Sequence, residues 1–274
     1  MKKYLFDYSF YKAVMVVLII TFGSCEDTFQ YNPNEVVLSE DEKDLNHKNI
    51  NRIEAIPQKD TLRFILISDT HHEYEDLDDF VDLVNSKNDI DFVLISGDLT
   101  NFGLQTEYRE TNNRLKKLKI PYVAVIGNHD LLGNGEKVYK EMYGTLNFHF
   151  RCNNFKFIGI NTNSREYNFN GRVPDLYFLR NELRDTNSFN RAFVIGHVPP
   201  FNDDFDPDLE PGYAFVLAES GKVQFAAHGH TGGYSLVNFY NNGVPYVQVD
   251  DMEARSYVLV SAWNNSISVE NIIF

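Results

Sequence analysis

The sequence has few cysteines, no long apolar segment and a deficit of basic residues. Two cysteines in 274 residues cannot build a disulfide framework. Lysine and arginine number 25 against 39 acidic residues, which gives a net charge of −14 at pH 7. Nucleic-acid backbones require basic surfaces, so this charge argues against a nucleic-acid polymer as the main partner. It does not exclude a small phosphorylated ligand whose charge is neutralised by bound metal ions.

The most apolar stretch near the start, AVMVVLIITF at 13–22, is only ten residues long. A membrane span needs about 20 apolar residues, so we do not expect a transmembrane helix there. The stretch follows several lysines and precedes FGSC at 22–25, as in a secretory signal. The tetrapeptide resembles the lipobox of bacterial lipoproteins, with Phe22 where leucine is usual. We expect residues 1–24 to be a signal peptide and Cys25 to be lipidated, with a plain secretory signal as the alternative.

A lipidated Cys25 would anchor the chain to the outer membrane of a bacterial cell envelope, on its periplasmic or its surface face. Residues 25–60 are then expected to form a tether and an N-terminal helix. Ser39 and Glu42 have the spacing of a capping box, which predicts a helix over about 40–55. The remaining residues, 61–274, are expected to form the main domain.

Within the main domain, apolar runs typical of buried strands alternate with helical patterns. The predicted strands are 62–68, 90–96, 122–127 and 191–196, and the predicted helices are 74–87, 104–118 and 174–185. Residues 146–162 read as a hairpin about Asn153–Asn154, and most of the chain after 222 is strand-like, with a turn signal at 241–243. This order predicts an α/β fold in which two packed mixed β-sheets are flanked by helices.

Polar clusters follow the predicted strands, at the edge where open α/β sheets carry their sites. The clusters are SDTHH (68–72), GD (97–98), GNHD (127–130), GH (196–197) and AHGH (227–230). Six of the eight histidines lie in these clusters. One such cluster is a common turn signal, but five of them in succession indicate a site.

The order of these clusters resembles that of the calcineurin-like metallophosphoesterases. Their pattern is D-x-H, G-D, G-N-H-[DE], G-H and G-H-x-H, and the resemblance runs from about 61 to 235. It implies a four-layer α-β-β-α sandwich and hydrolysis of a phosphomonoester or phosphodiester bond. The chemistry implied is attack by a hydroxide that two metal ions activate.

The resemblance also implies a ligand set for the two ions. The first ion would take Asp69, His71, Asp98 and His230, and the second would take Asp98, Asn128, His197 and His228. Asp98 would bridge the two ions. Carboxylates together with imidazoles suit Mn, Fe or Zn.

Two alignments of the last cluster are possible. In the first, residues 227–230 stand for G-H-x-H, so His228 and His230 are both ligands and Ala227 replaces the glycine. In the second, residues 229–232 do, and Gly232 replaces the second histidine. We prefer the first alignment because it keeps both imidazoles.

The GNHD cluster supplies two candidate catalytic residues. His129, which is not assigned to an ion, is suited to donate a proton to the leaving oxygen or a hydrogen bond to a phosphoryl oxygen. Asp130 could orient and charge it. His72 is expected to point away from the ions.

The predicted function is therefore a metal-dependent phosphoesterase with a small phosphorylated substrate. The alternatives are a non-catalytic metal- or ligand-binding module on the same fold and a hydrolase of another bond. Substrate choice is expected to rest on the loops 101–108, 131–138, 163–173 and 201–213. The acidic run at 203–208 is expected to be a solvated loop that rims the site.

Overall fold

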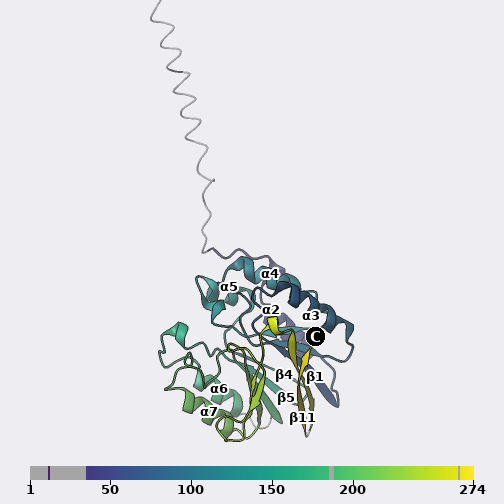
Figure 1. Cartoon of the computed structure of the whole chain (residues 1–274), viewed down its shortest axis with the longest axis vertical. Helices are drawn as coiled ribbons and strands as arrows, with labels where there is room; N and C mark the ends of the chain where they lie inside the picture. Colours follow the sequence, from purple (N-terminus) through teal and green to yellow (C-terminus); the bar gives the residue numbers. More distant parts are fainter. Residues whose placement is uncertain (1–11, 13–34, 185–187, 265) are drawn as a thin grey trace, which may run out of the picture. The chain divides into compact units, whose positions relative to one another are not determined.

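The computed structural model describes residue 12 and residues 35–274 apart from 185–187 and 265 (Figure 1). The predicted lipidation site Cys25, and the signal peptide except for Lys12, lie outside the described residues and stay predictions. Residues 38–274 make one unit. Within the described part of the chain, no helix combines the length and the apolar character that a membrane crossing needs.

The strands form two mixed sheets. The first sheet has the order β11 (Ile267–Ile273), β10 (Ser256–Trp263), β1 (Thr61–Ile67), β2 (Phe92–Ile95) and β3 (Tyr122–Ala124). In it β1, β2 and β3 are parallel, and β10 and β11 are added antiparallel. The second sheet has the order β4 (Phe148–Cys152), β5 (Phe155–Gly159), β6 (Arg191–Ile195), β7 (Val223–His228), β9 (Tyr246–Gln248) and β8 (Ser235–Val237). Its four central strands are parallel, with β4 and β8 antiparallel at the edges.

The two sheets pack face to face around an aromatic core. Side chains alternate along β1, so Leu62, Phe64 and Leu66 point into this core. The Phe64 ring lies 5.2 Å from the rings of Phe157 in β5 and Phe193 in β6, edge to face with both. Burying one such ring contributes about 1.5–3 kcal/mol. Contacts of this kind join the two sheets and fix where their strand ends meet.

Helices cover the outer faces of both sheets (Figure 1). On the first sheet, Phe80 of α3 lies 6.0 Å from Tyr257 of β10, and Tyr122 of β3 donates to Asn112 of α4 over 2.8 Å. On the second sheet, α6 and α7 pack onto β6 and β7. The helices are α2 (Leu45–Glu54), α3 (Tyr74–Ser86), α4 (Gln105–Leu115), α5 (Gly135–Met142), α6 (Leu176–Arg184) and α7 (Glu210–Glu219). The predicted four-layer sandwich is confirmed.

Three helical predictions need correction. The helix predicted over 40–55 is a short 3-10 turn, η1 (Glu40–Glu42), followed by α2. Asp44 adopts a left-handed conformation, with φ +52°, and separates the two pieces. Helices α5 and α7 occupy parts of the segments 131–138 and 201–213, which were predicted as loops.

Turn η1 is held to α4 by one ion pair, and this pair predicts a pH effect. Glu42 accepts from Arg109 Nε over 2.7 Å and from Nη2 over 3.0 Å, and this lowers the pKa of Glu42 from 4.5 to about 2. The pair therefore stabilises the fold above pH 4.5, and its contribution is lost as the pH falls from 4.5 towards 2. We expect Glu42→Gln to lower the free energy of unfolding at pH 7 by about 1 kcal/mol, since the pair is partly exposed.

Urea unfolding at pH 7 and at pH 2.5 measures this difference. The gap between Glu42→Gln and the wild type should narrow at the lower pH. The matched control is Glu40→Gln in the same turn, where the side chain is 90% exposed. A gap of equal size at both pH values would show that the ion pair is not its cause.

Candidate metal centre

The loops that follow β1, β2, β3, β6 and β7 meet at one edge of the sandwich. The loop after β1 is joined to the loop after β2, because Asp69 N donates to Gly97 O over 3.1 Å and His71 N donates to Asp98 O over 3.2 Å. The second sheet's loops are joined because Gly229 N donates to His197 O over 3.0 Å. All five polar clusters of the sequence are therefore brought to one place.

Three of the candidate ligands at this edge adopt backbone conformations that non-glycine residues seldom take. Asp69, Asp98 and His230 have φ angles of +50°, +54° and +76°. Such conformations cost about 1–3 kcal/mol each and persist where the surroundings hold them. Gly127 lets the loops approach closely, since a Cβ there would overlap the Asp98 side chain and backbone. The folded chain thus bears local strain to place these side chains.

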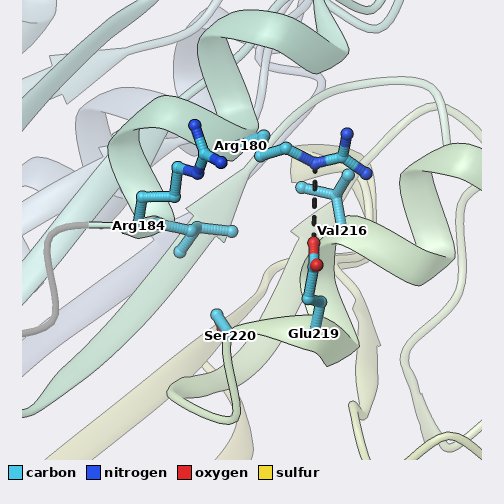
Figure 2. Close-up of a pocket in the computed structure, with 6 residues that line it drawn as sticks. Arg180, Arg184, Val216, Glu219 and Ser220 are labelled. Atoms are coloured by element: carbon cyan, nitrogen blue, oxygen red, sulfur yellow. Dashed lines mark ion pairs between the residues drawn. The ribbon is translucent and has the colours of Figure 1, made fainter.

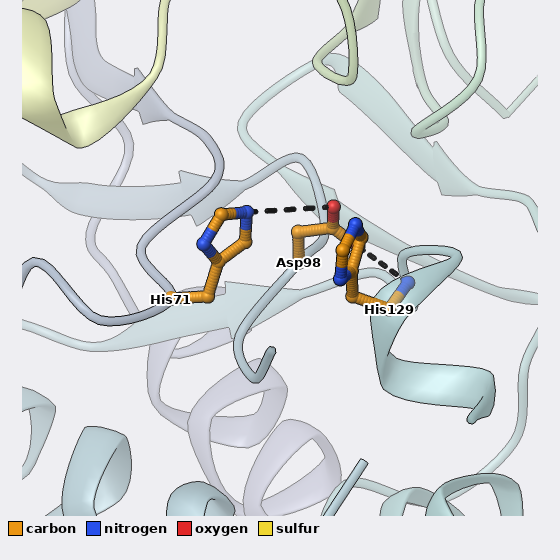
Figure 3. Close-up of side chains that lie close together, drawn as sticks. All are labelled: His71, Asp98 and His129. Atoms are coloured by element: carbon orange, nitrogen blue, oxygen red, sulfur yellow. Dashed lines mark hydrogen bonds and ion pairs between the residues drawn. The ribbon is translucent and has the colours of Figure 1, made fainter. Parts of the chain in front are cut away.

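Asp98 lies at the centre of the cluster (Figure 3). One carboxylate oxygen, Oδ2, lies 3.2 Å from His197 Nε2 and 3.8 Å from His71 Nε2. The other, Oδ1, accepts from the backbone N–H of His129 over 3.0 Å. Two groups of potential ligands share this residue: one adds His71 and His129, and the other adds Asp69 and His197. This shared position is the one that the bridging prediction requires.

His197 presents a lone pair to the cluster. Its Nδ1 lies 2.7 Å from the Ser96 carbonyl oxygen, which can only accept, so Nδ1 carries a proton. In a neutral ring Nε2 is then unprotonated, and it faces Asp98 Oδ2 at 3.2 Å and Asn128 Oδ1 at 2.9 Å. Three acceptor atoms that face one another need a proton or a cation between them.

His230 also presents a lone pair to the cluster, but from Nδ1, whereas His197 does so from Nε2. Its Nε2 lies 3.2 Å from Asp204 Oδ2, a carboxylate oxygen, so Nε2 carries the proton. Its Nδ1 faces Asn128 Oδ1 at 3.0 Å. The ring lies 5.2 Å from that of His197, at a steep angle. Asn128 Oδ1 is therefore approached by two imidazole lone pairs.

These spacings fit a metal ion. Ligand atoms about 2.0–2.2 Å from one ion lie about 3 Å from each other, and the acceptor pairs above are 2.9–3.2 Å apart. A set of carboxylate, amide and imidazole donors suits Zn, Mn or Fe. The residues present thus fit the centre that the resemblance implies.

The electrostatics of the cluster also call for positive charge. Burial raises the pKa of Asp69, and the Asp98 carboxylate adds to that rise while His197 opposes it. Burial alone would raise the pKa of Asp98, but the charge and hydrogen bond of His197 lower it. Burial alone would lower the pKa of His197, but the Asp98 and Asp69 carboxylates raise it to about 10. Metal ions and protons compete for such donors, so a bound cation would displace this proton.

His228 lies beside the cluster, and its buried Nδ1 has no hydrogen-bond partner among the described residues. His228 is the last residue of β7, where Phe225 and Ala227 face the other sheet and Ala226 faces the helices. Alternation turns His228 towards the helices, with Nε2 3.3 Å from the Tyr213 hydroxyl of α7. Burial lowers the pKa of His228 to about 3, so the ring is neutral. That His228 holds an ion with Asn128 and His197 stays a prediction, and His230 also reaches Asn128 Oδ1, at 3.0 Å.

His129 is held by a residue that the sequence did not single out. Its Nδ1 lies 2.8 Å from the Asn101 carbonyl oxygen and so carries a proton, which leaves Nε2 to serve the reaction. Its ring is 5.1 Å from that of His71. His72 instead points outward, 55% exposed, with Nε2 3.8 Å from Glu107. This agrees with the expectation that His72 points away.

Asp130, the predicted partner of His129, makes its own hydrogen bonds to the loops after β2 and β3. Its carboxylate is fully buried and accepts from Gly127 N, Leu99 N, Thr100 N and the Thr100 hydroxyl over 2.8–3.1 Å. These bonds tie the loop after β2 to the loop after β3. Burial and the charge of Asp98 raise the pKa of Asp130 to about 7. Asp130 thus shapes the loops, and the ring of His129 is held by Asn101.

A cavity of about 320 Å³ between α6 and α7 lies away from this cluster (Figure 2). Arg180 and Arg184 line it from α6, and Glu219 lines it from α7, 3.5 Å from Arg180. These residues belong to the last turns of their helices, which lead back to the starts of β6 and β7. The cavity therefore lies at the sheet edge opposite the polar clusters.

The fold and the cluster define a metal-dependent hydrolase whose site lies at the carboxyl ends of two packed sheets. The sequence model of the calcineurin-like phosphoesterases matches residues 62–234, and the chain belongs to this family. It is a hydrolase of phosphoric esters.

Relatives and solved structures agree with this assignment. A "probable cyclic nucleotide phosphodiesterase" of Xenorhabdus bovienii is 25% identical over 170 residues, which cover 59% of this chain and 68% of that protein. One of Ruthia magnifica is 28% identical over 173 residues, with coverages of 58% and 68%. A dimetal phosphatase of Danio rerio has the same fold, with a TM-score of 0.63 at 12% identity, over 77% of this chain and 95% of that one.

The surroundings of Gly229, in the last polar cluster, predict a mutational effect. A Cβ at Gly229 would overlap Ser68 Oγ and Asp69 Oδ2, which is the close approach that a glycine before a ligand histidine permits. We expect Gly229→Ala to destabilise the fold by about 1–3 kcal/mol and to weaken metal binding. Thermal unfolding and metal analysis measure both effects.

The matched control is Gly233→Ala, four residues on, where a Cβ would meet nothing within 4 Å. Gly233 has φ +74°, so the control carries backbone strain without the overlap. If Gly229→Ala bound metal as the wild type does, the close approach of Gly229 to Asp69 would not matter for metal binding.

Proposed function

We propose that the chain is a dinuclear metal phosphodiesterase. The observation that carries the metal site is the convergence of acceptor atoms of Asp98, Asn128, His197 and His230 within 2.9–3.2 Å of one another, where a metal ion would replace the proton that His197 otherwise holds. Asp98, Asn128, His197 and His230 would hold one ion, and Asp69, His71 and Asp98 the other. This grouping moves His230 to the second ion, and His228, whose buried Nδ1 has no hydrogen-bond partner in the described part of the chain, stays a candidate ligand.

Two bound divalent cations would supply the Lewis acidity and the nucleophilic water of this reaction class. The chain's own residues orient the imidazole ligands and supply a proton donor. Ser96 and Asp204 each fix the proton of an imidazole on the nitrogen that faces away from the cluster. The Asn101 carbonyl holds Nδ1 of His129, so Nε2 is the nitrogen from which His129 would protonate the leaving oxygen. The identity of the ions follows from the donors as Mn, Fe or Zn.

The choice of a diester is supported by the names of the two curated relatives. It also agrees with the charge of the site, in which the buried groups are carboxylates and imidazoles. A diester anion carries one negative charge where a monoester carries up to two. It therefore demands less positive charge from an acidic protein with a net charge of −14.

Hydrolysis of bis-p-nitrophenyl phosphate and p-nitrophenyl phosphate by the Mn²⁺-loaded protein tests the proposal. A faster rate on the diester, lost when the metal is chelated and restored by Mn²⁺, is the expected result. A faster rate on the monoester would redirect the substrate to phosphomonoesters. Metal-loaded protein that hydrolysed neither ester nor 3′,5′-cyclic AMP would contradict the phosphodiesterase proposal.

A further inference from the structure

The loop between β6 and α7 turns two carboxylates of the acidic run inward: Asp206, which is buried and accepts from backbone N–H groups, and Asp204, which faces the candidate metal centre. The sequence 203–208 reads as a solvated stretch, but the Asp204 side chain is only 14% exposed. Its backbone is fixed at two points, because its N–H donates to Asn202 Oδ1 over 2.9 Å and its carbonyl accepts from Arg165 N over 3.2 Å. Asp203, its neighbour, is exposed. Asp204 is therefore placed by the loop's own hydrogen bonds.

The Asp204 carboxylate lies between a cation and a candidate ligand. Oδ1 lies 2.7 Å from Arg165 Nη1, and Oδ2 lies 3.2 Å from His230 Nε2. The Arg165 side chain is 60% exposed and comes from η3 (Arg165–Tyr167), in the loop that follows β5. A chain of contacts thus runs from the surface through Arg165 and Asp204 to His230.

The contact with Asp204 determines which nitrogen of His230 faces the cluster. A carboxylate holds the ring proton on Nε2, so the lone pair of the neutral ring is on Nδ1, which faces Asn128 Oδ1 at 3.0 Å. Without a partner on its outer side, the ring of His230 could carry its proton on either nitrogen. A fixed partner on the outer side removes this choice. Carboxylates that hold the distal nitrogen of a ligand histidine fix its tautomer and raise its basicity.

We propose that Asp204, braced by Arg165, is a positioning residue that holds His230 with Nδ1 as a metal ligand. The proposal rests on the metal site of the proposed function. It assigns Asp204 a role in metal retention, whereas the sequence indicated only a solvated loop. Arg165 acts through Asp204 by holding its carboxylate in the orientation that His230 needs.

The affinity of the full chain for Zn²⁺, measured by chelator competition in detergent, tests this role. Asp204→Ala is expected to weaken the binding of one ion by about 10–100-fold, the usual effect of losing such a partner. Asp204→Asn is expected to weaken it less, because its amide oxygen still accepts from Nε2. Asp203→Ala, at the exposed neighbour, is the matched control and should bind Zn²⁺ as the wild type does.

The part played by Arg165 is tested by a double-mutant cycle. Arg165→Ala alone should lower the same affinity by a smaller factor, and in the Asp204→Ala background it should change nothing further. Long-range proton–nitrogen NMR of the Zn²⁺-loaded protein reports the tautomer, with the His230 signals identified by their loss in His230→Gln. A proton on Nε2 in the wild type is expected.

The outcomes separate this proposal from the proposed function. If the wild type bound no Zn²⁺, the metal site itself would be wrong. If the wild type bound two ions and both Asp204 variants bound them with unchanged affinity, only the role of Asp204 would be overturned. If Asp204→Ala failed to fold, Asp204→Asn and the wild-type tautomer would still decide the question, and a proton on Nδ1 would contradict it.

Discussion

Asp98→Asn is expected to lose metal and activity together. Asp98 is the residue common to both candidate ligand groups, so its charge faces both ions at once. Replacing it with a neutral amide removes the attraction between one anion and two divalent cations, a difference of several kcal/mol at this degree of burial. We expect fewer than two ions per chain and a fall in phosphodiester hydrolysis of at least about a thousandfold, at 1.4 kcal/mol for each factor of ten.

The Asp98→Asn substitution should perturb the fold little, so a loss of metal or activity can be attributed to the lost charge. Asn adopts the left-handed backbone conformation of residue 98 readily, and its amide oxygen can still accept from His129 N. Metal content by mass spectrometry, hydrolysis of bis-p-nitrophenyl phosphate and circular dichroism would be measured on the same samples. The control is Asp203→Asn, at an exposed residue of the rim. A folded Asp98→Asn protein that kept two ions would rule out the bridging role.

The strands of this fold could be predicted because each is short and apolar on at least one face. The hairpin at Asn153–Asn154 is also found, between β4 and β5. Helices α5 and α7 could not be predicted from local signals. Gly133–Asn134–Gly135 stands at the start of α5, and Pro211–Gly212 lies in the first turn of α7, and both are ordinary turn sequences. Packing against the rest of the chain outweighs these local preferences.

The site was predictable in its residue types and less so in its geometry. Site residues of such folds follow the ends of strands, so Asp69, Asp98 and Asn128 could be predicted from the order of the polar clusters in the sequence. The role of His228 depended on where β7 ends. Because β7 includes residue 228, its Nε2 contacts Tyr213 of α7 and leaves Nδ1 as the nitrogen that could serve an ion, which the sequence pattern alone does not show.

Asp204 and Asn101 show what sequence patterns leave out. Both come from loops whose course is set by contacts with distant segments. Asp204 is fixed partly by Arg165, and Asn101 contacts His129 through its backbone carbonyl, so its side-chain identity carries no signal. Residues whose role depends on a contact with a distant segment, or on a backbone atom, can be identified only from the folded structure.

His129→Ala is expected to lower kcat on 3′,5′-cyclic AMP by about 10²–10⁴, the usual span for a lost general acid or base. The ion content should stay nearly intact, because the proposed ligand sets do not include His129. The ring is held by the Asn101 carbonyl with Nε2 available, as a proton donor to the leaving oxygen requires. KM should change little, since the lost interaction is made in the transition state. His72→Ala, at the exposed neighbour of His71, is the matched control.

The choice of substrate distinguishes an acid from a metal ligand. The leaving group of bis-p-nitrophenyl phosphate departs as a stable anion without a proton, whereas the sugar oxygen of a cyclic nucleotide needs one. If His129 is the acid, the loss of rate should be large for the cyclic nucleotide and much smaller for the nitrophenyl ester. If His129 holds an ion with His71 and Asp98, a grouping that its proximity to them also allows, both rates should fall together with the ion content. Equal losses on the two substrates with full metal occupancy would exclude both roles and leave His129 as a residue that binds the phosphoryl group.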